Sequence, residues 1–176
     1  MTTAAIIESG MTFGPYAAGQ CFYIEKGDCY QKVQDGVQMA EFLLLRQQEK
    51  GPTVWIVEAK SSCPRDFTTY MDEIRTKLVN AFLLGVAACI GRHPPANDEL
   101  PQTFKDLDLK STSFRFVLVI KGVPEYHLEV LQNALGTLLK PVIKIWALPP
   151  TSVMVLNEDL ALKNALILAP ADAAAH

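Results

Sequence analysis

The chain has 176 residues, of which 49% are hydrophobic and 20% are charged, and its formal net charge is −3 with a pI of about 5.6. This length and balance predict a single globular domain over residues 1–176 and exclude a disordered chain. The acidic total also excludes a protein that binds nucleic acid through an overall positive field, so such binding would need a local basic patch.

The cysteines and the N-terminal residues predict a cytoplasmic protein. Cys21, Cys29, Cys63 and Cys89 form no C-x-x-C pair, and Cys89 with His93 has no second ligand pair, which argues against a zinc site. Small thiols in a reducing compartment are the favoured interpretation. The N-terminus lacks the pattern of a signal peptide, and no apolar run reaches membrane-spanning length. We therefore expect no membrane partner.

The N-terminal third is expected to contain coil followed by β-structure. Residues 1–20 are predicted to be mostly coil because glycine and proline recur in them, with a short helical turn over residues 4–8 as one option. Two runs that contain aromatic residues, 21–25 and 29–33, flank Lys26-Gly27-Asp28. This pattern predicts a first β-hairpin.

Residues 53–60, Thr-Val-Trp-Ile-Val-Glu-Ala-Lys, are the strongest candidate for a buried strand. The preceding run, residues 39–46, connects to it through the polar segment 47–52, which has a suitable length for a hairpin. We therefore predict a second antiparallel hairpin. A helix over residues 37–46 is the alternative, because Leu, Met, Glu and Arg are good helix formers.

The rest of the chain alternates between helical and extended patterns. Apolar residues at steps of three and four predict an amphipathic helix over residues 66–90. After it the patterns predict a long loop (93–112), a strand (114–120), a helix (124–139) and a second strand (142–148). An edge strand (153–156), a short helix (157–166) and a frayed tail (169–176) are predicted to follow. The order predicts an α/β or α+β three-layer domain: N-terminal β-hairpins, a long helix, then β-α-β around a mixed sheet.

Three charged residues are predicted to converge on one face of the second hairpin. Side chains alternate along a strand, so Glu58 and Lys60 share a face. If Glu41 lies opposite Glu58, it joins them, and Arg46 then pairs with Thr53.

Two carboxylates and an ammonium group at one point suit phosphodiester hydrolysis. Carboxylate oxygens hold Mg²⁺ or Mn²⁺, which polarises a phosphate and activates water. A lysine adds positive charge for the attacking water or the developing negative charge. The alternative is an ion-paired strand end with no catalytic task.

The segments 40–45 and 56–60, followed by a long helix, strand, helix and strand, resemble the PD-(D/E)XK nuclease superfamily and its restriction-endonuclease-like fold. The resemblance covers residues 37–148. It implies that Glu41 and Glu58 ligate the metal together with the backbone carbonyl of Ala59, and that Lys60 assists the water. Many members carry a further glutamate on a preceding helix, and Glu8 is the one candidate for that place.

We therefore expect a Mg²⁺- or Mn²⁺-dependent nuclease that acts on DNA or RNA, with DNA favoured. The alternative is a catalytically inactive module of the same fold that binds a protein partner or forms an oligomer. Arg75 and Lys77, on the polar face of the long helix, are candidates for contact with a phosphate backbone. The alternative is that this face of the helix is simply exposed to solvent.

Overall fold

The computed structural model describes residues 1–94 and 96–169. At its centre lies a five-stranded mixed sheet with the strand order β3-β4-β5-β6-β7. These strands span Cys21–Phe22, Phe42–Gln48, Gly51–Lys60, Ser113–Ile120 and Val153–Leu156. Strands β4 and β5 are antiparallel, whereas β5, β6 and β7 are parallel to one another. A separate antiparallel hairpin joins β1 (Ile6–Glu8) and β2 (Met11–Phe13).

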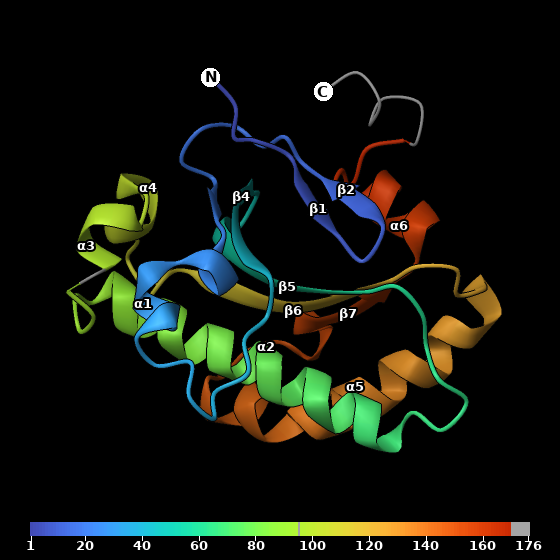
Figure 1. Ribbon diagram of the computed structural model, residues 1–176. Coiled ribbons are helices and arrows are strands. Elements are labelled where there is room, and N and C mark those ends of the chain that lie inside the picture. Colours follow the sequence, from blue (N-terminus) through green and yellow to red (C-terminus); the bar gives the residue numbers. More distant parts are fainter. Residues whose placement is uncertain (95, 170–176) are drawn as a thin grey trace.

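Helices cover the sheet in the arrangement predicted for a three-layer domain. The long helices α2 (Thr68–Cys89) and α5 (Glu125–Ile145) lie along one face, and the β1–β2 hairpin and α6 (Glu158–Lys163) lie over the other (Figure 1). The remaining elements are short: α1 (Asp28–Gln31), α3 (Ala96–Glu99), α4 (Gln102–Lys105), and the 3₁₀ turns η1 (Ile24–Lys26) and η2 (Pro150–Ser152). Among the described residues, no helix has the length and apolar character needed to cross a membrane.

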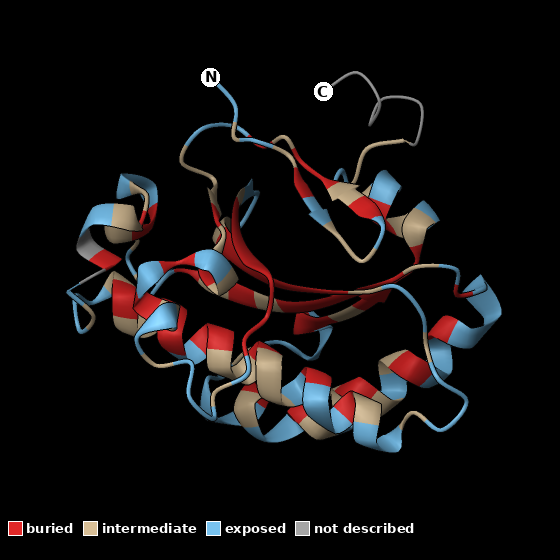
Figure 2. Ribbon diagram, viewed as in Figure 1, coloured by how far each residue is buried: buried red, intermediate tan, exposed pale blue. Residues whose placement is uncertain are grey.

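The central strands are apolar on both faces because each face carries its own core (Figure 2). On the helical side, β4 contributes Leu43 and Leu45; on the other side it contributes Phe42 and Leu44. A strand covered on both sides needs no alternation of polar and apolar residues. This explains why residues 37–46 had a composition compatible with helix as well as strand.

The predicted second hairpin is confirmed, including its register. Arg46 pairs with Thr53 and Phe42 with Val57, and a two-residue turn at Glu49-Lys50 connects the strands. The strand begins at Phe42 rather than at residue 39. Gly51 follows the turn with a φ of 112°, a conformation that L-residues with side chains rarely adopt.

The predicted hairpin over residues 21–33 is wrong. Only Cys21–Phe22 is a strand, and the chain then turns through η1 into α1. Both oxygens of the Glu99 carboxylate accept hydrogen bonds from backbone N–H groups at the start of α1, from Asp28 at 2.6 Å and from Cys29 at 2.9 Å. These bonds satisfy amides that a helix start leaves free. The partner lies 71 positions away, so no local pattern could indicate it.

One further local prediction for the N-terminal segment is corrected. Residues 6–8 form strand β1 rather than a helical turn, and β2 pairs with it, while most of the first 20 residues lie outside these two strands. The hairpin is held on the second core by buried side chains, including Ile6, Met11 and Phe13.

The predicted strand over residues 142–148 is also wrong, because α5 continues through Pro141 to Ile145. Ile143 extends the buried stripe of the helix, whose members recur at three- and four-residue steps: Leu128, Leu131, Leu135, Leu139 and Ile143. The parallel strand after α5 is instead β7, at the position predicted for an edge strand.

The other predictions for the second half agree with the structure in outline. The helices predicted over residues 66–90 and 157–166 correspond to α2 and α6, and the loop over residues 93–112 contains α3 and α4. Of the predicted tail, residues 170–176 lie outside the described residues.

Phe82 on α2 is expected to be the main anchor between the helices and the sheet. It is 1% exposed, and its ring centroid lies 4.6 Å from that of Trp146, 4.9 Å from that of Phe114 and 5.5 Å from that of Phe116. We predict that Phe82→Ala lowers the free energy of unfolding by about 3–5 kcal/mol. Leu83→Ala, at the next position with 50% exposure, should cost less than about 1 kcal/mol. Urea unfolding measures both, and equal losses would contradict this assignment.

Candidate functional site

The β4–β5 hairpin places Glu41 across from Glu58 on the helical face of the sheet. Glu41 immediately precedes β4, and its backbone N–H donates a hydrogen bond to the Val57 carbonyl at 3.0 Å. Phe42 pairs with Val57, so the next pair in this register is Glu41 with Glu58. Both carboxylates are buried, with exposures of 5% and 0%. Lys60 is on the same face and reaches Glu58, as alternation along the strand predicts.

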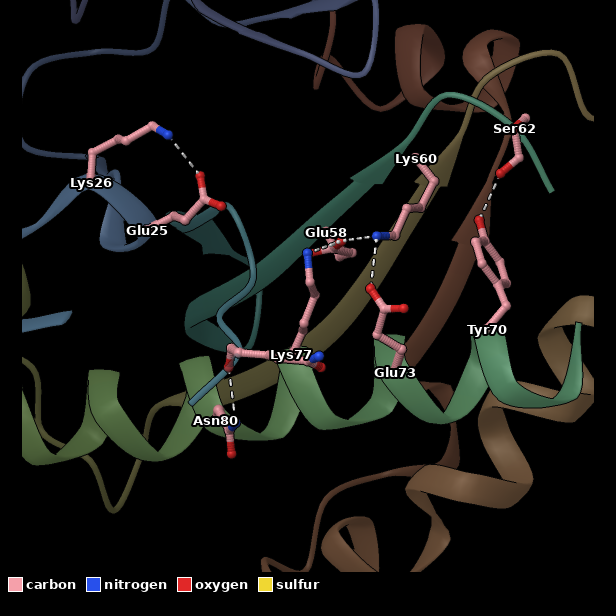
Figure 3. Close-up of polar contacts among 10 residues, drawn as sticks. Glu25, Lys26, Glu58, Lys60, Ser62, Tyr70, Glu73, Lys77 and Asn80 are labelled. Carbon is pink, nitrogen blue, oxygen red and sulfur yellow. Dashed lines mark hydrogen bonds and ion pairs between the residues drawn. The ribbon is translucent and has the colours of Figure 1, made fainter. Parts of the chain in front are cut away.

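Two lysines hold one oxygen of the Glu58 carboxylate. The Nζ atoms of Lys60 and Lys77 each lie 3.1 Å from Glu58 Oε1 (Figure 3). Lys60 also contacts Glu73 Oε1 at 3.5 Å, so α2 contributes both a cation and an anion to the cluster. Glu73 and Lys77 are four residues apart and therefore lie on the same side of the helix. The four-residue spacing was visible in the sequence, but its contact with Glu58 was not.

The charges in this cluster strongly influence one another. Burial raises the pKa of Glu58, while the ammonium groups of Lys77 and Lys60 act to lower it. Burial acts to lower the pKa of Lys77, but Glu58 outweighs this effect and holds that pKa above its usual value. Lys77 therefore remains charged beside Glu58. The other oxygen of Glu58, Oε2, is buried and has no hydrogen-bond partner among the described residues.

Glu41 is a strongly perturbed carboxyl group. Burial, followed by the negative charges of Glu58, Glu25 and Glu8, raises its pKa to about 8. Its Oε2 atom, like that of Glu58, is buried without a hydrogen-bond partner in the described part of the chain. Unpaired buried carboxylate oxygens are costly, and a native fold that keeps them needs a reason.

Glu41 also belongs to a group of three carboxylates. Glu8 at the end of β1, Glu25 in η1 and Glu41 each offer an oxygen, and these oxygens all lie within 4.8 Å of one another. The Glu25 backbone N–H donates to the Glu41 carbonyl at 3.2 Å, which links η1 to the start of β4. Glu8, the predicted extra glutamate, is therefore near Glu41, although it comes from a strand rather than a helix. Sequence reasoning missed Glu25 because its segment was interpreted as a hairpin.

Neighbouring side chains hold two of these carboxylates. The hydroxyl of Tyr23 donates a hydrogen bond to Glu8, and its pKa is raised first by burial and then by that bond. Lys26 contacts Glu25 at 3.2 Å, but the Lys26 side chain is 62% exposed (Figure 3). An exposed pair of this kind contributes little to stability and is readily exchanged.

This set of oxygens fits a small divalent cation. Hard cations such as Mg²⁺ prefer carboxylate oxygens, and the three grouped carboxylates are within reach of one ion. The unpartnered oxygens of Glu41 and Glu58 add donors that nothing else in the described chain uses. Ala59, whose carbonyl was the third predicted ligand, is buried and turns its side chain to the opposite core.

The raised pKa of Glu41 predicts a specific dependence of stability on pH. The unfolded chain releases this proton near pH 4.5, whereas the folded protein keeps it until about pH 8. Between these values the folded state binds more protons, so stability is fully present below the lower value and falls as pH rises. Without metal, we predict that Glu41→Gln is more stable than the wild type at about pH 9, by on the order of 2 kcal/mol, and equal to it at about pH 4.

Urea unfolding in EDTA at several pH values measures this difference. Glu49→Gln, in the exposed hairpin turn, is the matched control and should follow the wild-type profile. An identical profile for Glu41→Gln and the wild type would contradict the assignment of Glu41 as the group that holds the proton.

Comparison of the chain with protein-family models, with curated proteins and with solved structures found no match in any of the three. The function of the protein is therefore inferred from the geometry of this site.

Proposed function

We propose that this protein hydrolyses phosphodiester bonds in nucleic acid with the help of Mg²⁺ or Mn²⁺. The observation that carries the proposal is the pair of buried, unpartnered oxygens on Glu41 and Glu58 beside two lysine ammonium groups. A structural ion pair would satisfy its own donors and acceptors, whereas this arrangement leaves acceptors free. Glu41, Glu58 and the carbonyl of Ala59 would hold the cation, as the superfamily resemblance implies.

The bound cation would supply Lewis-acid polarisation of the phosphate and of a water molecule. The residues of the chain supply the rest. Lys60, whose side chain is 20% exposed, can be reached from solvent while Glu58 and Glu73 hold its ammonium group in place. Its fixed positive charge would stabilise negative charge that develops on the phosphate. Lys77 is held on the same oxygen of Glu58, and its positive charge acts to lower the pKa of that carboxyl group against the effect of burial.

Glu8 and Glu25 extend the set of oxygens around Glu41. Three ionised carboxylates this close would repel one another, which favours the protonated form of Glu41, and a divalent cation would replace that proton and relieve the repulsion. Lys26 would leave Glu25 at little cost because that pair is exposed. This group supports a site that takes its metal at the edge of the sheet, where β1, η1 and the start of β4 meet.

A second candidate function is that of a binding module without catalysis. The observation that favours it is the exposure of apolar side chains on or next to α2, namely Leu83 at 50% and Ile90 at 57%. Such a module would bind a protein partner or a second copy through this helix. The grouped carboxylates favour the hydrolase, because a binding module has no use for them.

Metal binding is expected to stabilise the folded protein measurably. A ligand that binds only the native state at about 100 times its Kd raises the free energy of unfolding by about 2.7 kcal/mol. We predict that Mn²⁺ or Mg²⁺ raises the Tm of the wild type and of Glu49→Gln, and that Glu41→Gln loses this shift. Calorimetry with and without EDTA measures it. A wild-type Tm that neither Mn²⁺ nor Mg²⁺ changes would count against the metal site.

Cleavage is expected to depend on Glu58 and Lys60. We predict that the wild type cuts a labelled oligonucleotide in Mg²⁺, and that Glu58→Gln and Lys60→Met each lower the rate by about 100-fold or more. Lys50→Met removes the same charge from the exposed hairpin turn and should cut at the wild-type rate. Gel assays on single-stranded DNA, duplex DNA and RNA provide the measurement. If the wild type binds metal but cuts none of these substrates, the binding module becomes the better description.

A further inference from the structure

A pocket of about 620 Å³ lies between the loop that follows β5 and the turn that follows β6. The residues that line it begin at Ser61, which directly follows Lys60. The two segments are held together at this point, because the Lys121 backbone N–H donates a hydrogen bond to the Lys60 carbonyl at 2.9 Å. The Tyr70 hydroxyl donates to the Ser62 carbonyl at 2.9 Å and fixes the first loop to α2. Figure 3 shows this contact beyond Lys60, on the side away from Glu25. The pocket therefore adjoins the candidate site along the chain.

Two cationic side chains line this pocket. Arg65 and Lys121 contribute them, and no described residue that lines the pocket is acidic, although the chain as a whole carries a net charge of −3. Arg65 is exposed and forms no hydrogen bond or ion pair with any described residue. Lys121 donates one hydrogen bond to the Gly10 carbonyl at 2.9 Å, which leaves further donors on its ammonium group. Local positive charge is what an acidic protein needs in order to bind a phosphate.

Apolar side chains also line the pocket. Phe67, Val130 and Leu131 are among them, and Val130 is 55% exposed. The pocket volume falls within the range of roughly 300–1,000 Å³ that is usual for small-ligand sites. Apolar side chains and two cations in one pocket match the two ends of one nucleotide, a flat base and a phosphate.

We propose that this pocket binds one unpaired nucleotide of a single-stranded nucleic acid. The base lies against Phe67, Val130 and Leu131, and its phosphate contacts Arg65 and Lys121. A base can enter such a pocket only when it is not paired, so single strands are preferred over duplexes. The inference rests on the proposed function, because it places a neighbouring phosphodiester of the same strand beside Lys60. DNA and RNA share the chemistry used here.

Binding can be tested separately from cleavage, in EDTA. The probes are a fluorescein-labelled single-stranded DNA of about 12 nucleotides, the RNA of the same sequence and the DNA duplex, followed by fluorescence anisotropy. Arg65→Gln should weaken binding of the single strand and reduce the slope of log K against log salt by about 0.7, the value for one lost phosphate contact. Arg92→Gln removes the same charge from an exposed position after α2 and should behave like the wild type.

Val130→Glu gives a second, independent test at an exposed position that should not affect folding. It places a negative charge among the apolar residues that line the pocket and should weaken single-strand binding about tenfold or more. Preferential binding of the DNA or of the RNA probe would identify which strand the pocket takes. Duplex binding as tight as single-strand binding would overturn the proposal, and so would wild-type affinity and salt slope in Arg65→Gln.

The experiment also separates this inference from the proposed hydrolase. Binding is measured in EDTA, where no divalent cation is available for cleavage, so the role of Arg65 is tested apart from that of Glu41, Glu58 and Lys60. Arg65-dependent binding in a protein that cuts nothing would support the pocket and count against the hydrolase. If Arg65→Gln cuts at the wild-type rate and binds the single strand with wild-type affinity, the hydrolase is supported and the nucleotide pocket is contradicted.

Discussion

The burial of the Glu58 carboxylate is the constraint on which the rest of the structure depends. A charge with no exposed surface in the middle of a sheet is stable only if cations accompany it. Lys60 comes from the same strand, two residues further on, but Lys77 comes from α2. The helix must therefore cross the sheet with Lys77 facing β5, which also turns Glu73 toward Lys60 and directs Phe82 into the aromatic group beside the sheet.

The same arrangement bears on function because a stable fold does not require it. Well-packed apolar residues in place of a buried ion pair are often neutral or stabilising, so Glu58 and Lys77 are not explained by stability alone. Glu41 adds a second buried carboxylate nearby, and one oxygen of each acid is left without a partner in the described chain. We interpret this cost as the preparation of a cation site. The nucleotide pocket proposed beside Lys60 would place the substrate at the same end of the parallel strands.

Features of the fold and of the candidate site could be predicted from the sequence where the contacts that determine them join residues close together in the chain. The β4–β5 register followed from the short connection and from the rule that side chains alternate, and the structure reproduces the pairing of Arg46 with Thr53. The segment 21–33 was predicted wrongly because its helical turn is capped by Glu99, which is remote in sequence. The segment 142–148 was predicted wrongly because Ile143, whose β-branched side chain favours a strand, lies on the buried stripe of α5, where packing outweighs propensity.

The sequence by itself determined the mixed three-layer class, the central hairpin and the shared face of Glu41, Glu58 and Lys60. Each of these follows from the periodicity of a single element or of two elements joined by a short turn. Only the tertiary structure decided that Lys77, Glu8 and Glu25 join them, since these residues come from α2, β1 and η1. No periodic pattern relates those elements to β5. Their meeting is set by how the two cores on either side of the sheet pack, and this is a property of the whole chain.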